Sequence, residues 1–300
     1  MTPVMSLKFQ VGARTLASFS CRLVRVAYSL DAVLAGAPPV LPTLPVDADG
    51  YLVTSLPETA LDELDGRSLI MAVRQRYVRY FVDLSAGEAA WLAGLSGSAR
   101  SGLKRKAKKL AAANGDALDI RRYHDAEGFA AFHPLARAVS ATTYQEALLG
   151  SGLPEDDRSV RHLRALAESD RLRAWLLFLD GAPVAYLCCT AEGDSLRYDH
   201  VGHDPAHNAL SPGAVLQVEA MRDLFAEGRF ARFDFTEGEG QHKRQFSTGG
   251  TACVDVLLLR RTLGNRAMLG ALRGFDEAMA LAKRAAAHPA LAKLAKKIRR

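Results

Sequence analysis

The segment around Ser211 has the residue types of an anion-binding helix start. Ser211 is a predicted N-cap, and Pro212 follows at the first helical position, where its missing N–H costs no hydrogen bond. The backbone amides of Gly213, Ala214 and Val215 would then lie at the positive end of the helix. Gly213 has no side chain to keep a phosphate away. The pattern predicts a phosphate or other anion site, with an ordinary capped helix as the alternative.

Three histidines nearby, His200, His203 and His207, have a spacing that suggests metal ligands, and Asp199 and Asp204 lie among them. A metal site needs three or four converging N, O or S ligands. This cluster crosses from the end of a predicted strand into a loop that contains proline, so its spacing does not force the side chains together. We predict no metal site here.

A basic run, residues 100–109, carries six lysines and arginines without an acid. It suits an anionic substrate such as a nucleotide-linked sugar, a lipid phosphate or tRNA, and the alternative is a solvated helix face. Few aromatic residues interleave with the charges, which disfavours binding of single-stranded nucleic acid.

The C-terminal residues 283–300 hold most of the remaining charge asymmetry. They contribute +7, whereas the whole chain carries +6 from 39 basic and 33 acidic residues, so the rest of the chain is at −1. Leu291, Leu294 and Ile298 form an apolar stripe opposite lysines. This pattern suits weak binding to an anionic membrane surface, docking on the body of the protein, or a disordered tail.

Composition places the chain among ordinary globular proteins, with 49% hydrophobic and 24% charged residues. No apolar run approaches the roughly 20 residues of a membrane span, and no secretory signal is recognisable. The four cysteines have no CxxC spacing and are expected to be reduced, buried thiols. We therefore expect a cytoplasmic protein. P-loop, GxGxxG, GxSxG and HExxH patterns are absent.

The elements that must position these residues alternate between helix and strand after residue 116. Upstream, we expect mostly loop over 35–57, two strands over 68–73 and 77–84 separated by a polar break, and one helix over 85–113 that begins at a capping box. Downstream, the turn and cap signals predict a strand over 117–123, helices over 125–139 and 156–169, a meander of strands over 173–179, 183–190 and 195–201, a helix from 211 to 228, a strand over 230–236, a short helix over 241–246, a strand over 253–259 and a final helix broken near Pro289.

This order resembles the GNAT acyltransferase fold. The hairpin 175–187 is similar to its second and third strands, and 198–205 with 210–213 is similar to its fourth strand and cofactor loop. The run 233–238, followed by His242, Lys243 and Arg244, resembles the branch related to FemAB transferases and to acyltransferases of exopolysaccharide gene clusters. Members of that branch often carry a Tyr-Lys pair where this chain has His242 and Lys243. A basic helix before the core, like residues 100–109, also fits the branch.

The resemblance implies an α/β (α+β) fold with a central mixed, mostly antiparallel sheet flanked by helices. The predicted division has three parts: an N-terminal partial lobe over 1–115, a GNAT-like acyltransferase domain over 116–262, and a basic helical tail over 263–300.

The implied activity is transfer of an acetyl or longer acyl group from acyl-CoA to an amine or hydroxyl of a small molecule or a glycan or lipid precursor. The resemblance places Val201 and Gly202 beside the thioester. It places the cofactor's pyrophosphate at the predicted helix start, and we expect Lys243 to neutralise an anionic part of cofactor or acceptor. The cofactor-binding candidates are thus Val201, Gly202, Ser211, Gly213, Ala214, Val215 and Lys243.

The catalytic candidates are polar residues near the predicted strand ends. His200 or Glu237 is the candidate base, Asp199 is adjacent, and Tyr144 lies in a segment that forms acceptor-site walls in the family. Enzymes of this fold also work without a dedicated base.

Two other functions remain open. One is a FemAB-like transferase that takes an aminoacyl group from tRNA, with the basic helix as its tRNA contact. The other is a non-catalytic adaptor that the tail holds at the inner face of the membrane.

Overall fold

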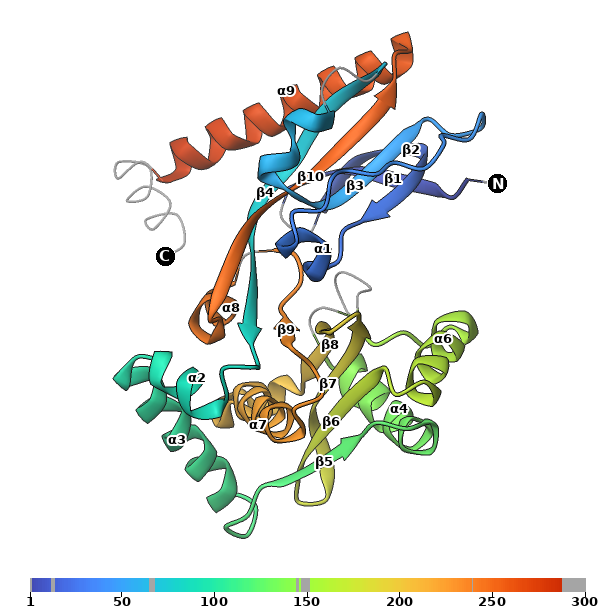
Figure 1. Ribbon diagram of the computed structural model, residues 1–300. Coiled ribbons are helices and arrows are strands. Elements are labelled where there is room, and N and C mark those ends of the chain that lie inside the picture. The colour runs from blue at the N-terminus through green and yellow to red at the C-terminus, as the bar shows by residue number, and fades with distance from the viewer. Residues whose placement is uncertain are drawn as a thin grey trace. The chain divides into compact units, whose positions relative to one another are not determined.

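The computed structural model describes residues 2–11, 14–64, 68–143, 146, 152–238 and 240–287 (Figure 1). The chain forms two compact units, and each gathers separate stretches of sequence. The first contains residues up to 28, residues 38–76 and residues from 254 onward, and the second contains 29–37 and 77–253. The three-part division by sequence stays a prediction. No helix in the described ranges has the length and apolarity to span a bilayer.

The described strands form one mixed sheet in the order β1-β2-β3-β10-β4-β9-β8-β7-β6-β5. Pairing is parallel between β2 and β3 and between β8 and β9. It is antiparallel between β1 and β2, β4 and β9, β5 and β6, β6 and β7, and β7 and β8. Helices flank the sheet, which confirms the predicted fold class. The strands are β1 Val4–Val11, β2 Arg14–Ala27, β3 Gly50–Pro57, β4 Leu69–Asp83, β5 Asp119–Tyr123, β6 Leu172–Leu179, β7 Ala182–Glu192, β8 Ser195–His203, β9 Arg232–Asp234 and β10 Gly249–Arg260.

The second unit contains the helices α1 Leu30–Leu34, α2 Glu88–Gly94, α3 Gly97–Ala112, α4 Ala126–Ala141, α6 Asp157–Glu168, α7 Pro212–Glu227 and α8 Gln241–Phe246, and the short 3₁₀ helix η3 Pro205–Leu210. The first unit contains α9 Leu263–Ala287 and the short 3₁₀ helices η1 Glu58–Ala60 and η2 Asp62–Leu64.

In the second unit, the central strands are buried on both faces. Every residue of β6 is buried. Its alternation sends Trp175 and Leu177 into a core with α7 and α3, and Leu176 and Phe178 into a core with α4 and α6. Continuous apolar strands of this kind require a helical layer on each side. The side chains packed between the sheet and α7 set the distance of this helix from the sheet. They therefore also set the position of its N-terminus.

In the first unit, α9 covers one face of the sheet and the segment with η1 and η2 covers the other. Leu257 and Leu259 of β10 join Met268, Leu269 and Leu272 of α9 in one core. The neighbouring residues Val256 and Leu258 pack with Leu56 and Leu64 on the opposite side. The predicted final helix thus begins at Leu263, and its break near Pro289 lies outside the described residues, as does the rest of the predicted tail from residue 288 onward.

Three predictions of secondary structure were wrong. Residues 50–57 form β3 rather than loop. The two strands separated by a polar break are one strand, β4, because Gln75 donates to Asp255 at 2.6 Å and Arg76 pairs with Glu58. The helix over 85–113 is two helices: the backbone is extended at Leu95, and Ser96 accepts from the amide of Ala99 at 3.1 Å to cap α3.

Candidate active site

The site begins where β8 and β9 stop pairing. The two strands run in parallel register only from Ser195 with Arg232 to Arg197 with Asp234. Beyond that point β9 has ended, while β8 continues to His203 and stays paired with β7 on its other edge. In the described part of the chain, the second half of β8 therefore has one strand neighbour. The remaining edge carries backbone polar groups that can bind a ligand.

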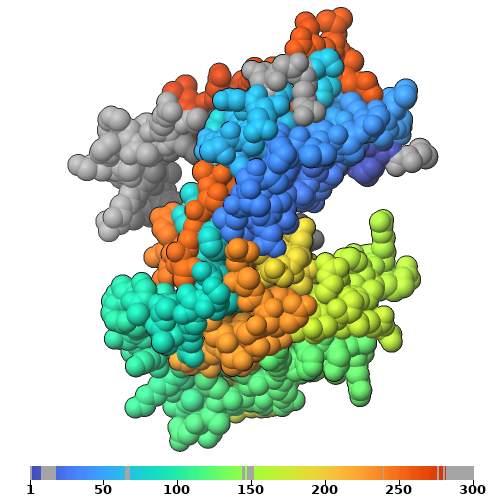
Figure 2. Space-filling model, viewed as in Figure 1, coloured from blue at the N-terminus to red at the C-terminus, as the bar shows by residue number. Residues whose placement is uncertain are grey.

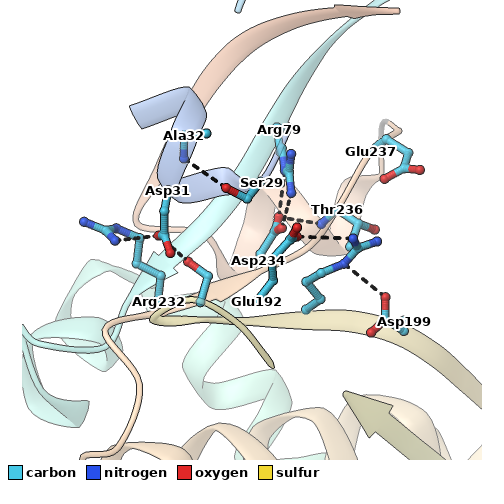
Figure 3. A network of polar contacts seen from close by, with 12 residues as sticks. Ser29, Asp31, Ala32, Arg79, Glu192, Asp199, Arg232, Asp234, Thr236 and Glu237 are labelled. Carbon is cyan, nitrogen blue, oxygen red and sulfur yellow. Dashed lines mark hydrogen bonds and ion pairs between the residues drawn. The ribbon is translucent and has the colours of Figure 1, made fainter. Parts of the chain in front are cut away.

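A buried ion pair fixes the end of β9. The guanidinium of Arg79 donates from Nε to Asp234 Oδ1 at 3.1 Å and from Nη2 to Oδ2 at 2.5 Å. The Arg79 and Asp234 side chains are 2% and 1% exposed. Asp234 Oδ1 also accepts from the amide of Thr236 at 2.8 Å (Figure 3). Thr236 has φ +61°, which is unusual for a β-branched residue. The pair thus anchors the turn at which the chain leaves the sheet.

A second carboxylate ties the starts of the same two strands together. Asp31, at the beginning of α1, accepts at Oδ1 from Ser195 Oγ at 2.7 Å and from Arg232 Nη1 at 2.8 Å. Its Oδ2 accepts from the amide of Asp194 at 3.1 Å. Figure 3 shows Asp31 reaching from α1 toward Arg232. This clip holds β8 and β9 together at one end, so the separation is confined to the other end.

A β-bulge changes the direction of the side chains in residues 198–203, the open half of β8. Cys188 pairs with His200 and the next residue of β7 pairs with Tyr198, so Asp199 is an extra residue in β8. The Asp199 carboxylate accepts from Thr190 Oγ1 at 2.5 Å and pairs with Arg197 Nε at 3.2 Å. Asp199 therefore has structural partners that fix the bulge.

A cavity of about 700 Å³ occupies the space beside this open half. Its walls come from β8, η3, the first turns of α7, the residue past the end of β9, and α8. The lining residues are Thr143, Tyr198, Asp199, Val201, Gly202, His203, Pro205, Asn208, Gly213, Ala214, Gln217, Thr236, His242, Lys243 and Phe246. The volume is within the usual range for small-molecule sites.

Six predicted residues lie in this lining: Asp199, Val201, Gly202, Gly213, Ala214 and Lys243. Gly202 fits only as glycine, because a Cβ there would lie 2.5 Å from Tyr186 Cε1 and 2.9 Å from Thr143 Cγ2. The Lys243 ammonium donates to the carbonyl of Glu237 at 2.6 Å. That bond fixes the ammonium near the turn that precedes α8.

The start of α7 differs from the predicted cap. Ser211 is in the left-handed region, with φ +54°, and its side chain makes no cap bond. Its carbonyl instead accepts from the amides of Ala214 and Val215, at 3.1 and 3.3 Å. Ser211 thus occupies the predicted N-cap position, but a backbone turn takes the place of the side-chain hydrogen bond. Ser211 and Val215 are outside the cavity lining, and Val215 is buried toward α3.

The predicted base candidates lie elsewhere. His200 is outside the cavity lining and near the backbone of Gly152, and burial lowers its pKa. Glu237 lies past the end of β9 and also outside the lining, and the charge of its carboxylate contributes to a raised pKa of Arg197 in the polar network of Figure 3. Tyr144 lies outside the described residues. The catalytic roles assigned to these residues stay predictions.

Residues that we had not assigned to the site stand in it. The His242 ring lies on Tyr198 and Phe235, with centroid separations of 6.2 and 6.4 Å. Burial and then the charge of Lys243 lower the pKa of His242. His203 contacts Asn208 Oδ1 through Nε2 at 2.7 Å. Across the described ranges, no three His, Cys, Asp or Glu side chains converge as a metal site requires.

Gln217 is the most unusual of these residues. Its side chain is 5% exposed, and its Nε2 has no hydrogen-bond partner among the described residues. A buried amide without a partner is costly, so such a group at a cavity wall is typical of a ligand contact. The sequence does contain a signal that could have identified Gln217 as a site residue. It lies one turn after Gly213, on the same face of the helix.

Residues 97–244 match the model of the acetyltransferase (GNAT) domain family. The match runs from the first residue of α3 to α8, and it contains every lining residue except Phe246. The matched segment is therefore a GNAT-like domain. The resemblance in sequence puts the cofactor beside Val201 and Gly202, where β8 has separated from β9. A search of curated proteins finds no significant match to the sequence.

Two solved structures share the fold over most of their length. The C-terminal domain of an Agrobacterium fabrum protein assigned as a lysylphosphatidylglycerol synthetase aligns with a TM-score of 0.51 at 13% identity, covering 74% of this chain and 70% of that one. FemX aligns with a TM-score of 0.51 at 11% identity, covering 85% of this chain and 87% of that one. At these identities the likeness concerns the fold alone.

Proposed function

We propose that this GNAT domain transfers an acetyl or longer acyl group from acyl-CoA to an amine or hydroxyl of a small molecule or a glycan or lipid precursor. The observation that carries the proposal is the cavity between the open half of β8 and the start of α7. It combines a strand edge that pairs with no second described strand, a helix N-terminus and polar side chains around one cavity.

The residues present fit such a donor. The backbone of Val201 and Gly202 offers a strand edge that an extended amide-containing arm can join as a further strand would. Gln217 supplies a buried amide that lacks a partner among the described residues. Gly213 leaves the start of α7 accessible, and His203 lies beside it: a Cβ at Gly213 would be 3.4 Å from His203 Nδ1.

Acyl-CoA supplies an activated thioester, and the chain must supply orientation, proton transfer and charge stabilisation. His242 fits the role of proton acceptor, because its lowered pKa keeps the imidazole neutral at pH 7. Lys243, in the same cavity wall, fits the role of stabilising negative charge on cofactor or acceptor.

Substitution of Gly213 by glutamate tests the proposal. The carboxylate of Gly213→Glu would occupy the phosphate position at the start of α7. In the parent, acetyl-CoA at a hundredfold excess over Kd should stabilise the fold by about 2.7 kcal/mol. The variant should show no such rise in melting temperature while its circular dichroism stays native-like. Gly94→Glu in α2, where a Cβ meets no atom within 4 Å, adds the same charge as a control. Equal stabilisation in Gly213→Glu and parent would refute the site.

A FemAB-like aminoacyl-tRNA transferase is the second candidate, because α3 presents six cations and no acid over 100–109. It predicts salt-sensitive retention of tRNA and no stabilisation by acetyl-CoA. The adaptor hypothesis predicts neither, with binding to anionic liposomes instead. The tail contact that it needs lies largely beyond the described residues.

A further inference from the structure

The basic residues of α3 have different surroundings. Leu103 and Ala107 pack toward the core of the second unit and orient the helix. Arg100 and Lys104 border an apolar groove against α7, whereas Arg105 and Lys106 border a polar groove against α8. The Lys109 ammonium donates to the carbonyl of Ala209 in η3 at 3.0 Å, and exposed Lys108 lines neither groove. Figure 2 shows α2 and α3, in teal to green, at the surface.

The groove between α3 and α8 has the composition of an anion site. Its volume is about 590 Å³. Three of its lining residues are cations, four others carry hydroxyl or amide donors, and none is a carboxylate. The residues are Ser96, Ser98, Ala99, Gly102, Leu103, Arg105, Lys106, Gln241, Arg244 and Gln245. The Lys106 side chain is half-buried, while its neighbour Lys108 is exposed.

The groove and the transfer cavity share a wall. His242, Lys243 and Phe246 of α8 line the cavity, whereas Gln241, Arg244 and Gln245 line the groove. The indole N–H of Trp91 in α2 donates to the carbonyl of Phe246 at 2.8 Å, which secures α8 at its end. A helix with its side chains is about 10–12 Å across, so a ligand in the groove is one helix width from the cavity. One substrate can span that distance.

We propose that the α3–α8 groove binds a phosphate group carried by a substrate of the transfer reaction. Guanidinium and ammonium groups with neighbouring neutral donors are the usual ligands of phosphate oxygens. Two sources share this chemistry: the 3′-phosphate of acyl-CoA, whose diphosphate the proposed function puts at the start of α7, and a phosphorylated acceptor. The proposal rests on the proposed function for its substrates.

The groove itself is tested with inorganic pyrophosphate. Lys106→Gln and Lys108→Gln remove the same charge from the same helix, and only Lys106 lines the groove. Calorimetry at low salt should show roughly tenfold weaker pyrophosphate binding for Lys106→Gln, the loss expected for one charged hydrogen bond, and little change for Lys108→Gln. Arg105→Gln provides a second variant of the same wall. Equal weakening by the Lys106 and Lys108 substitutions, or no binding by the parent, would overturn the proposal.

Comparison of CoA with 3′-dephospho-CoA identifies the source. If the 3′-phosphate lies in the groove, the parent and Lys108→Gln should prefer CoA, and Lys106→Gln should lose that preference. Equal binding of both forms by the parent, together with Lys106-dependent pyrophosphate binding, assigns the groove to the acceptor's phosphate. If neither CoA form binds while pyrophosphate binding depends on Lys106, the proposed CoA-dependent function fails and the phosphate site stands.

Discussion

The two halves of β8 differ in what lies beside them. Over 195–197 the strand lies between β7 and β9, and Asp31 holds its start. Over 198–203 it pairs with β7 alone among the described strands, and its other side lines the cavity. One continuous strand is therefore framework at one end and binding wall at the other. The difference comes from the neighbour: β9 ends at Asp234, and a buried ion pair fixes that end.

We expect the largest effect from a substitution that removes Arg79, the cation that holds the end of β9. Arg79→Met would leave the Asp234 carboxylate buried without its counter-charge, so we expect a loss of about 3–5 kcal/mol in the free energy of unfolding. Urea titration would measure it. Arg76→Met on the same strand breaks a pair whose side chains are 51% and 42% exposed, and it should cost less than about 1 kcal/mol. Similar losses for both variants would show that the buried pair does not anchor the strand end.

The cavity side of the comparison can be tested through its proposed proton acceptor. His242→Gln should lower kcat about a hundredfold, the lower end of the usual contribution of general base catalysis. Only neutral imidazole accepts a proton, so parent activity should persist below the ordinary histidine range and fall as pH drops through the lowered pKa of His242. A kcat–pH profile would show this acid limb in the parent and none in His242→Gln.

His207→Gln in η3, outside the cavity lining, is the matched control and should keep both kcat and the acid limb. An unchanged acid limb in His242→Gln would assign proton transfer to another group.

We expect the smallest effect from substitution of Gln217, which tests whether this residue binds the donor or only supports the fold. Gln217→Leu removes an amide whose Nε2 has no partner in the described structure, so the free energy of unfolding should not fall. Acetyl-CoA affinity should weaken about tenfold if the amide contacts the donor. Unchanged affinity with reduced stability would show that Gln217 acts in packing.

The sequence predicted the arrangement around the cavity better than the residues inside it. Turn and cap signals placed the strands of the 173–201 meander, α7 and α8, because these signals are local. The residues inside the cavity depend on which face of β8 each side chain takes. The bulge at Asp199 shifts the alternation of side chains by one residue, so Tyr198 and Val201 both line the cavity and His200 does not.

The N-terminal part was predicted less well because its polar residues have distant partners. Gln75 looks like a strand breaker until Asp255, which is 180 positions away, accepts its hydrogen bond. His242 was visible in the sequence, but only the rings of Tyr198 and Phe235 beside it show that it belongs to the cavity. Long-range contacts of this kind leave no periodic signal in the local sequence.

The clip made by Asp31 determines where this protein can be cut. The family match begins at residue 97, yet Asp31 and Arg79, which secure β8 and β9, both come earlier in the chain, and Phe246 of the cavity wall comes after the match ends. A fragment trimmed to the matched segment would expose the start of β8 and leave the Asp234 carboxylate without its arginine. The second unit is thus assembled from two separate stretches of the polypeptide, and a recombinant fragment must retain residues 29–37 and 77–253.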